Sequence, residues 1–164
     1  GCIESFESLV GQFEKPLYRF LLAKTRNHHQ AEDLLQETFL ITYRKLNQFN
    51  PVYPFSSWIF TIANRLAISY FRKHKPMQEE YDIPTYKTPR CEVIAAETSQ
   101  TLWAKARCLL SSNHYAALWL FYNERMTIEQ VAQTMNRKPN SVKVWLHRAR
   151  KRLAQELNPR PSLS

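Results

Sequence analysis

Residues 126–157 read MTIEQVAQTMNRKPNSVKVWLHRARKRLAQEL, a pattern that predicts two helices joined by a short turn. Thr127 and Gln130 have the spacing of a capping box, which marks the start of the first helix. Asn136 tolerates a positive φ and stands where that helix should end. Pro139 suits the first turn of a second helix. The arrangement is typical of a helix-turn-helix.

The second predicted helix has an apolar face and a basic face. Its apolar face consists of Val142, Trp145, Leu146, Ala149 and Leu153, and its other face carries Lys143, Val144, His147, Arg148, Arg150 and Lys151. Between residues 137 and 157 the sequence has seven Lys or Arg and a single Glu. This imbalance favours binding to a polyanion, although a solvated amphipathic helix with a basic surface fits the same pattern.

Composition restricts the fold and the class of partner. The chain has 164 residues, 44% hydrophobic content, only two Gly and a formal net charge of +9. Such a chain can bury one core of ordinary size or two small ones, and its composition predicts mainly helices. The positive charge favours a nucleic acid or an anionic surface as partner. No apolar run approaches the ~18 residues of a membrane span, so membrane insertion is not expected.

Cysteine and histidine positions predict neither a disulfide framework nor a metal site. The cysteines Cys2, Cys91 and Cys108 are widely spaced and odd in number, which favours a reducing cytoplasm. The five histidines have no Cys or carboxylate at metal-ligand spacing. We therefore expect no metal and no cofactor, and a chain with two glycines has no phosphate-binding loop.

Two helices are predicted before residue 50. Apolar residues at helical spacing predict the first over residues 6–25, with Pro16 bending it or dividing it in two. The second spans residues 31–46, after a polar connection at 26–30. Its outer face begins acidic with Glu32, Asp33 and Glu37 and ends basic with Arg44 and Lys45. This order suits the helix dipole, and it also offers an acidic docking patch.

A loop rich in aromatic rings precedes a third helix. Residues 47–57 contain Phe49, Tyr53 and Phe55 among prolines, and the helix over residues 57–73 starts at a serine cap. The outward side of this helix is predicted to carry Thr61, Asn64, Arg65, Ser69, Arg72 and Lys73. Rings beside cations are typical of single-stranded nucleic-acid binding, although each ring alone more simply closes the core.

The chain then divides into two predicted domains. Residues 75–93 contain three prolines and no sustained period, which indicates a flexible linker. The first domain is assigned to residues 1–74 and the second to 94–158, with a tail at 159–164. In the second domain, a helix over residues 94–110 is followed by serine caps and by a helix at 115–122 that is apolar on all sides. The predicted fold is all-α, with two small helical domains.

At this point nearly the whole chain resembles a bacterial RNA polymerase sigma factor of the extracytoplasmic-function (ECF) type, a group that keeps only regions 2 and 4. The stretches AEDLLQETF (31–39) and FSSWIFTIANRLAISYFRK (55–73) resemble the region 2 helices. The stretch LFYNERMTIEQVAQTMNRKPNSVKVWLHRARKRL (120–153) resembles the region 4 helix-turn-helix. Two blocks in the family's order are a stronger signal than either alone.

The resemblance implies partners and site residues. Core RNA polymerase would be bound at its clamp helices and flap region, with contacts from Asp33, Gln36, Glu37 and Arg44. The promoter's −10 element would be bound and opened by Asn47, Phe49, Tyr53, Phe55, Asn64, Arg65, Ser69, Arg72 and Lys73. An anti-sigma factor, which family members commonly have, would cover the polymerase-binding faces.

The −35 element would be bound in the major groove by the helix that begins at Pro139. Lys143, Val144, His147 and Arg148 would reach base edges, and Lys138, Asn140, Ser141, Arg150 and Lys151 would hold phosphates. The chain departs from the family pattern at several of these positions. Asn136 replaces a turn glycine, Lys138 a common serine, Val144-Trp145 a common Ser-Arg pair, and Ser69 a frequent aspartate.

The resulting functional hypothesis is a non-enzymatic specificity subunit that directs transcription initiation in the cytoplasm. The alternative is a stand-alone helix-turn-helix regulator that binds an operator. It gives no reason for an acidic docking helix ahead of a basic, ring-rich loop. A small hydrolase or nuclease has little support because no carboxylate cluster accompanies the histidines.

Overall fold

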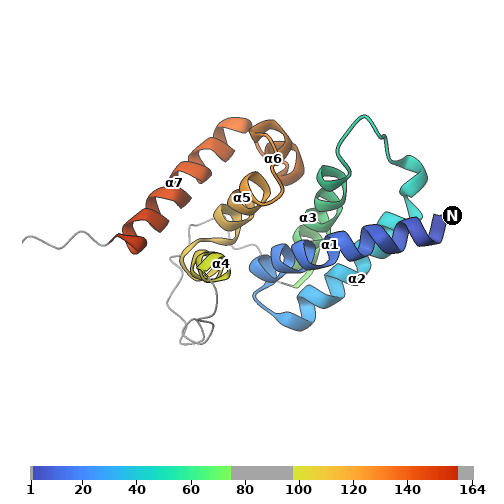
Figure 1. Cartoon of the computed structure of the whole chain (residues 1–164), viewed down its shortest axis with the longest axis horizontal. Coiled ribbons are helices and arrows are strands. Elements are labelled where there is room, and N and C mark those ends of the chain that lie inside the picture. Colours follow the sequence, from blue (N-terminus) through green and yellow to red (C-terminus); the bar gives the residue numbers. More distant parts are fainter. Residues whose placement is uncertain (1, 75–97, 159–164) are drawn as a thin grey trace, which may run out of the picture.

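The computed structural model describes residues 2–74 and 98–158, with side chains described from residues 3 and 102 onward. These ranges contain helices and no strand, which confirms the all-α prediction (Figure 1). The helices are α1 (Cys2–Thr25), α2 (His28–Arg44), the short 3-10 helix η1 (Leu46–Gln48), α3 (Phe55–His74), α4 (Thr98–Leu109), α5 (Ser112–Tyr122), α6 (Ile128–Met135) and α7 (Pro139–Leu157). No described helix is long and apolar enough to cross a membrane. The predicted linker and tail lie outside the described residues.

Helix α1 runs unbroken through Pro16, so the alternative that this proline divides the helix is wrong. A proline at this position deprives the carbonyl of Gln12 of its helical donor. Gln12 is exposed, so water can replace that donor. On the opposite side of α1, Leu17, Phe20 and Leu21 are fully buried, and the rings of Phe20 and Phe60 meet edge to face at 5.3 Å. Burial of this side holds α1 against α2 and α3.

Helix α2 begins earlier than the sequence pattern predicts. The Asn27 side chain caps it by accepting a hydrogen bond from the Gln30 N–H at 3.1 Å, so the polar connection is shorter than predicted. Two threonines lie in its buried face. Thr38 and Thr42 donate their hydroxyl hydrogens to the carbonyls of Leu34 and Thr38, at 2.6 and 2.7 Å. Their polar atoms are therefore satisfied inside the core.

Helix α3 starts at Phe55, so the predicted serine cap is wrong. Both serines lie inside the first turn, and Pro54 immediately precedes the helix. The Phe55 ring packs against Phe13 of α1 at 5.5 Å and against Phe49 at 5.3 Å. These ring contacts fix the beginning of α3 against α1.

The described chain has a first half, residues 2–74 with α1 to α3, and a second half, residues 98–158 with α4 to α7. The second half is built around α5. Every residue of α5 from His114 to Leu120 is buried, as its apolar sequence predicts, and Ser111 caps the helix. Cys108 in the preceding helix α4 is disulfide-bonded. The expectation that nothing in the chain forms a disulfide is therefore wrong for this cysteine, because sequence spacing does not reveal which sulfurs meet in space.

The helix-turn-helix formed by α6 and α7 is confirmed in detail. Thr127 and Gln130 form both bonds of the capping box, at 3.2 and 2.9 Å. Asn136 ends α6 with φ 54°, in the left-handed region, and Pro139 opens α7. Local sequence chemistry alone therefore sets the beginning of α6, the turn and the beginning of α7.

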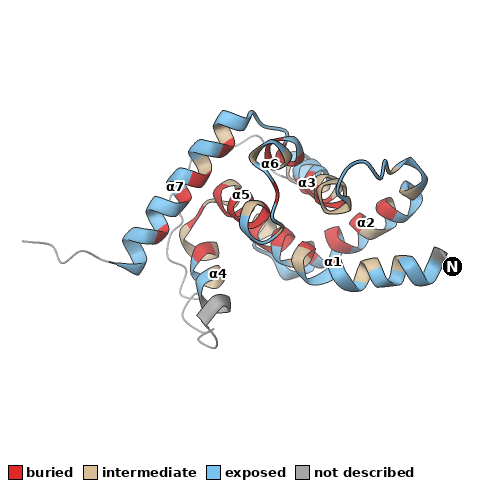
Figure 2. Ribbon diagram, turned by 45° about the horizontal axis from the view of Figure 1, so that its top comes forward, coloured by how far each residue is buried: buried red, intermediate tan, exposed pale blue. Residues whose placement is uncertain are grey.

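The two halves pack against each other, which the sequence pattern does not predict. Helix α1 lies against α5, and α3 lies against α6 (Figure 1). Figure 2 shows buried positions on the sides where these helices meet, while α7 is exposed along its outer side. The buried apolar residues of both halves form one continuous cluster. Opening the two halves would therefore expose apolar surface.

Candidate nucleic-acid interface and protein-docking surface

Helix α7 presents a basic row from a firmly anchored helix. Val142, Leu146, Ala149 and Leu153 are buried beneath it. The outward row consists of Lys143, Val144, His147, Arg148 and Lys151, all exposed, with Val144 at 45%. An α-helix of this kind fits the major groove of B-DNA, where base edges carry a distinct pattern of donors and acceptors. The predicted base-contacting residues therefore share one accessible face.

The beginning of α7 is open to solvent. Lys138 occupies the N-cap without a side-chain capping bond, as its lack of a short polar side chain predicts. Asn140 is exposed and Ser141 is half-buried. A helix N-terminus with a lysine beside it has a positive potential, which suits a phosphate.

Arg150 is exposed, and its side chain contacts α5. Its Nε donates a hydrogen bond to the Tyr122 hydroxyl at 2.7 Å. Its guanidinium also lies 5.7 Å from the Phe121 ring centre and 5.5 Å from that of Tyr122. Arg150 therefore ties α7 to α5, and its predicted role at a phosphate stays a prediction.

Helix α3 carries a second row of outward polar side chains. Arg65, Ser69, Arg72 and Lys73 are exposed, as predicted. Asn64 is only 1% exposed, so its predicted outward position is wrong. Its Nδ2 donates a hydrogen bond to the Thr134 carbonyl of α6 at 3.2 Å. A helical pattern cannot show that another helix covers the polar side of α3.

The ring-rich loop has two half-buried rings and an exposed one. The Phe49 ring contacts Phe55 and Trp58 at 5.3 and 5.1 Å, and Phe55 packs against the core. Tyr53 is 58% exposed, and the neighbouring Val52 is 81% exposed. Of the three rings that the sequence offered for base stacking, Tyr53 is the accessible one.

A short turn presents Tyr53 and Val52. The Asn50 side chain accepts a hydrogen bond from the Val52 N–H at 3.0 Å, and the Asn50 carbonyl accepts one from the Tyr53 N–H at 3.1 Å. Asn47, predicted to contact DNA, is exposed at the preceding 3-10 helix. The loop is therefore shaped by its own hydrogen bonds and by the rings beneath it.

The outer face of α2 combines carboxylates with exposed apolar side chains. Asp33, Gln36, Glu37 and Arg44 are all exposed. The same face carries Leu40 at 56% and Tyr43 at 52% exposure, which the sequence interpretation missed. The available signal was their helical spacing: Leu40 lies four residues after Gln36, and Tyr43 lies three residues after Leu40. An apolar centre with a charged rim is typical of a protein-binding surface.

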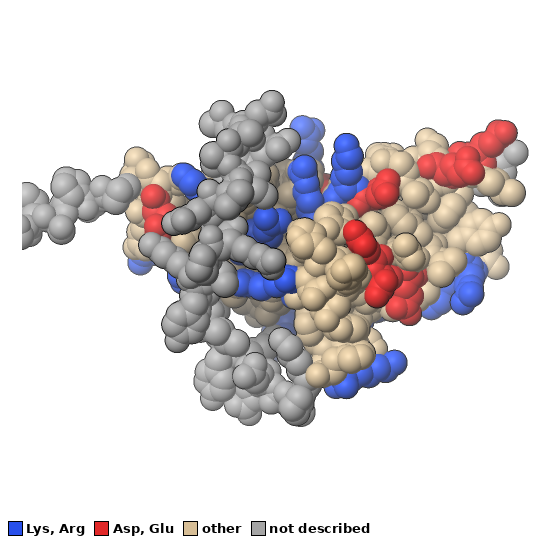
Figure 3. Space-filling model, turned by 90° about the horizontal axis from the view of Figure 1, so that it is seen from below, with Lys and Arg blue, Asp and Glu red and all other residues tan. Residues whose placement is uncertain are grey.

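The docking face lies in the acidic part of the molecule. In Figure 3, acidic side chains gather on the half that contains α1 and α2, while Lys and Arg dominate next to the second half. The basic rows of α3 and α7 and the outer face of α2 thus differ in charge as well as in position. This difference suits two kinds of partner on one chain.

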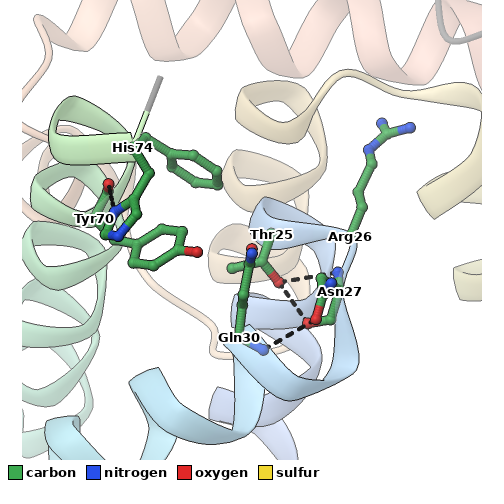
Figure 4. Close-up of a pocket in the computed structure, with 7 residues that line it drawn as sticks. Thr25, Arg26, Asn27, Gln30, Tyr70 and His74 are labelled. Atoms are coloured by element: carbon green, nitrogen blue, oxygen red, sulfur yellow. Dashed lines mark hydrogen bonds between the residues drawn. The ribbon is translucent and has the colours of Figure 1, made fainter. Parts of the chain in front are cut away.

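One open pocket lies where α1, α2 and α3 end or begin, lined by Thr25, Arg26, Asn27, Gln30, Tyr70, Phe71 and His74. Tyr70 and His74 stack at 4.2 Å on one side, and the Arg26 side chain extends away from Thr25 and Asn27 (Figure 4). None of the predicted polymerase or DNA contacts lines this pocket. Within the described residues, no group of three His, Cys, Asp or Glu is placed to hold a metal ion.

Comparison with known proteins identifies both halves. The family model for Sigma-70 region 2 matches residues 9–76, and that for Sigma-70, region 4 matches residues 114–153. The chain belongs to the sigma-70 family. The matched ranges include α2 and α3 in the first half, and α6 with α7 up to residue 153 in the second. The candidate surfaces therefore all lie within, or immediately beside, recognised sigma-70 regions.

Individual relatives refine this family assignment to the ECF type. The chain is 29% identical to the ECF RNA polymerase sigma factor SigM of Bacillus subtilis, over 91% of this chain and 93% of SigM. It is 25% identical to SigW of the same organism, over 96% of this chain and 91% of SigW. This sigma-70 member is thus an ECF-type alternative sigma factor, a protein that directs transcription initiation.

Solved structures agree with the fold. The sigma factor RpoE of Bartonella quintana, crystallised with the anti-sigma factor NepR, aligns with a TM-score of 0.71 at 22% identity. The alignment covers 94% of this sigma-70 chain and 97% of RpoE. The structure of CnrH in complex with the cytosolic domain of CnrY aligns with a TM-score of 0.62 at 18% identity.

Proposed function

We propose that this ECF sigma factor binds core RNA polymerase through the outer face of α2 and binds two promoter elements through α3 and α7. The observation that carries the proposal is the presence, on one sigma-70 chain, of an acidic and apolar docking face and two separate basic rows. The sigma factor supplies specificity and binding energy, and the polymerase supplies the chemistry. We place this activity in the cytoplasm, where the polymerase acts.

The polymerase contact would centre on Leu40 and Tyr43. Asp33, Gln36, Glu37 and Arg44 would surround them and contact the clamp helices of the largest catalytic subunit, with a further contact of the chain at the flap region. Burial of an apolar centre favours affinity, and charged groups around it favour correct orientation. Glu37 lies three residues before Leu40 on the exposed face, so a change of its charge should be felt at the contact.

The −10 contact would use the exposed turn and the α3 row together. Arg65, Arg72 and Lys73 would hold the DNA backbone, with Ser69 beside them. Tyr53 would stack on a base taken out of the duplex, a contact worth about 1–3 kcal/mol. Extruding a base costs a few kcal/mol, so such stacking contributes to opening. Phe49 and Phe55 would act indirectly, because their half-buried rings contact each other beside the turn.

The −35 contact would place α7 in the major groove. Lys143, Val144, His147 and Arg148 would meet base edges, while Lys138, Asn140, Ser141 and Lys151 would hold phosphates. Val144 offers a methyl surface that suits the C5-methyl group of thymine. Arg150 would support a phosphate contact from its position against Tyr122. Each element alone would bind modestly, and connection within one chain raises the effective concentration of the second contact.

We further infer that an anti-sigma factor regulates the chain. The sigma factor RpoE, which has a similar fold, was solved with the anti-sigma factor NepR, and CnrH, also of similar fold, was solved with the cytosolic domain of CnrY. The exposed apolar face of α2 offers a surface that an inhibitor would need to cover in order to exclude polymerase. Competition between an inhibitor and polymerase for α2 would then set the activity.

A binding measurement with core polymerase tests the proposal. Glu37→Lys should weaken binding about tenfold or more, because it reverses a charge at the edge of the docking centre. Glu14→Lys is the matched control, because Glu14 is an exposed carboxylate on α1 and outside the outer face of α2. The control should retain binding. Equal binding by both variants would remove α2 as the docking face.

Absence of polymerase binding by the folded wild-type chain would favour the alternative, a stand-alone operator-binding regulator. The two functions also differ in their DNA requirement. A sigma factor needs polymerase to select promoters from a random library, whereas a regulator selects its operator without it.

A further inference from the structure

Three arginines from three segments gather where the end of α1 meets α4. Arg19 lies on α1, Arg26 lies in the turn between α1 and α2, and Arg107 lies in the last turn of α4. Arg19 and Arg26 are exposed, and Arg107 is half-buried. Within the described residues, none of the three forms an ion pair. We call them the arginine cluster. Figure 3 shows Lys and Arg side chains gathered next to the second half of the chain.

A hydrogen bond places the Arg26 guanidinium at the end of α4. Its Nη2 donates to the carbonyl of Leu110 at 3.2 Å, and its side chain extends away from Thr25 and Asn27 (Figure 4). Leu110 follows Arg107 by three residues, which is about one helical turn. Burial, and secondly repulsion by Arg107, lower the pKa of Arg26, in agreement with this proximity. A guanidinium has five N–H donors, so Arg26 keeps donors for a ligand.

Tyr115 of α5 adds a buried hydroxyl beside the cluster. Tyr115 is 3% exposed, and its ring contacts that of Trp103 of α4 at 5.8 Å. Arg107 follows Trp103 by four residues and therefore lies on the same side of α4. Burial raises the pKa of Tyr115 to about 12, although Arg107 and Arg19 are close enough to lower it in part. Its hydroxyl has no hydrogen-bond partner within the described residues. This protonated hydroxyl can therefore donate to a ligand.

Tyr18 of α1 lies on another side of the cluster. Its hydroxyl shares a hydrogen bond with Nδ1 of His28 at 2.6 Å. Burial, and secondly Glu32, raise the pKa of Tyr18, whereas Arg107 lowers it in part. Arg107 therefore lies close to both Tyr18 and Tyr115. Glu32 brings one negative charge to this side and forms no ion pair within the described residues, so the three arginines leave a net positive charge.

The chemistry of the cluster selects a class of anion. Guanidinium groups bind phosphate oxygens through two parallel N–H bonds, which favours phosphate over chloride. Arg19 and Arg26 are seven residues apart, which corresponds to about 10 Å along a helix. A chain of phosphate groups can reach donors spread over that length, whereas a single phosphate or sulfate meets fewer of them. Neutralisation by such a chain would also relieve the repulsion between Arg26 and Arg107.

We propose that the arginine cluster and the Tyr115 hydroxyl form a binding site for a polyphosphate group, supplied by an inorganic polyphosphate or by a nucleoside triphosphate. Arg26 and Arg107 pair with phosphate oxygens, Tyr115 donates its hydroxyl hydrogen, and Arg19 contacts the end of the ligand nearer to solvent. The site lies outside the faces of α2, α3 and α7 that the proposed function uses, so it does not rest on that function. A ligand that binds only the folded chain stabilises it by mass action.

Titration calorimetry of the full-length chain tests the site. The probes are tripolyphosphate, a nucleoside triphosphate and sulfate, each at about 150 mM chloride so that weak surface attraction is screened. Tripolyphosphate should bind about tenfold or more tighter than sulfate. Equal binding of the two triphosphates would assign recognition to the phosphates alone, and tighter binding of the nucleotide would make it the ligand. Binding of neither would overturn the proposal, as would sulfate that binds as tightly as tripolyphosphate.

Variants identify the residues that bind tripolyphosphate. Arg107→Gln should weaken its binding about tenfold or more, because it removes a charged donor. Lys105→Gln is the matched control, since Lys105 is an exposed cation on the same helix, and it should change affinity less than about twofold. Tyr115→Phe keeps the ring and should weaken binding about threefold or more. Circular dichroism checks that each variant is folded. If Arg107→Gln does not fold, Arg19→Gln at an exposed position takes its place.

Two results with the variants would overturn the proposal. Equal weakening by Arg107→Gln and Lys105→Gln would mean that tripolyphosphate is attracted by the overall positive charge and not by the cluster. The second result concerns DNA, which also carries phosphates, so a duplex of arbitrary sequence is titrated as a further probe. If Arg107→Gln weakened binding of the duplex but not of tripolyphosphate, the cluster would be a contact for the DNA backbone instead.

Discussion

At the residue scale, Lys24 is a charged group in an unfavourable position. Its burial, and secondly repulsion by Arg137, lower its pKa from 10.5 to about 8. Above pH 8 the folded protein loses this proton while the unfolded chain keeps it. Unfolding then takes up a proton, so the free energy of unfolding should rise with pH.

We expect this rise to reach about 1–2 kcal/mol between pH 8 and pH 9.5. Lys24→Met keeps the apolar stem, removes the charge and should abolish the rise. Urea unfolding of both proteins across this pH range measures it. A wild-type dependence that persists unchanged in the variant would show that Lys24 is not the group responsible.

The left-handed conformation of Asn136 allows a test of backbone strain in the turn between α6 and α7. Its φ of 54° costs a residue with a Cβ atom about 1–2 kcal/mol, and asparagine less than most. Asn136→Ala should therefore destabilise the protein by about 1 kcal/mol, while Asn136→Gly should be neutral or stabilising. Denaturant midpoints check the order. Equal stability of the Ala and Gly variants would contradict the argument.

At the scale of the element, the loop before α3 separates support from contact. Phe49→Ala should destabilise folding by about 2–4 kcal/mol, because its ring packs on Phe55 and Trp58. Tyr53→Ala should change stability by less than about 0.5 kcal/mol, since the ring is exposed. It should nevertheless slow promoter opening, measured by permanganate reactivity of unpaired thymines. Normal opening by a stable Tyr53→Ala protein would leave Tyr53 without its proposed role.

Recognition by α7 is the second test at this scale. Lys143→Ala or Arg148→Ala should cost about 1–3 kcal/mol of promoter binding if the side chain contacts a base, with relaxed preference at one −35 position. Selection from a random promoter library with polymerase present gives both quantities. Weakening that is uniform over all sequences would assign the residue to a phosphate instead.

The same elements show what sequence chemistry can predict. The capping box at Thr127, the positive φ of Asn136 and the buried stripe of α7 depend on neighbours along the chain, so periodicity and residue type predicted them. The burial of Asn64 depends on α6, which lies about 70 residues away. Phe49 and Tyr53 are aromatic residues of the same loop, but Phe49 packs on Phe55 and Trp58 whereas Tyr53 is exposed. Neither distinction is encoded in a local pattern, so each required the structure.

At the scale of the whole molecule, the packing of the first half (residues 2–74) on the second (residues 98–158) should contribute to stability. The buried apolar residues of both halves form one continuous cluster, and Arg26 donates a hydrogen bond from Nη2 to the carbonyl of Leu110 at 3.2 Å. Arg26→Asn tolerates the left-handed φ of 52° but loses this bond, so it should lower the free energy of unfolding by about 1–2 kcal/mol. Arg125→Asn is the control, because Arg125 has φ 53° and is exposed. Urea unfolding followed by circular dichroism measures both variants. Equal stability of the two variants would mean that the Arg26 hydrogen bond does not help to hold the halves together.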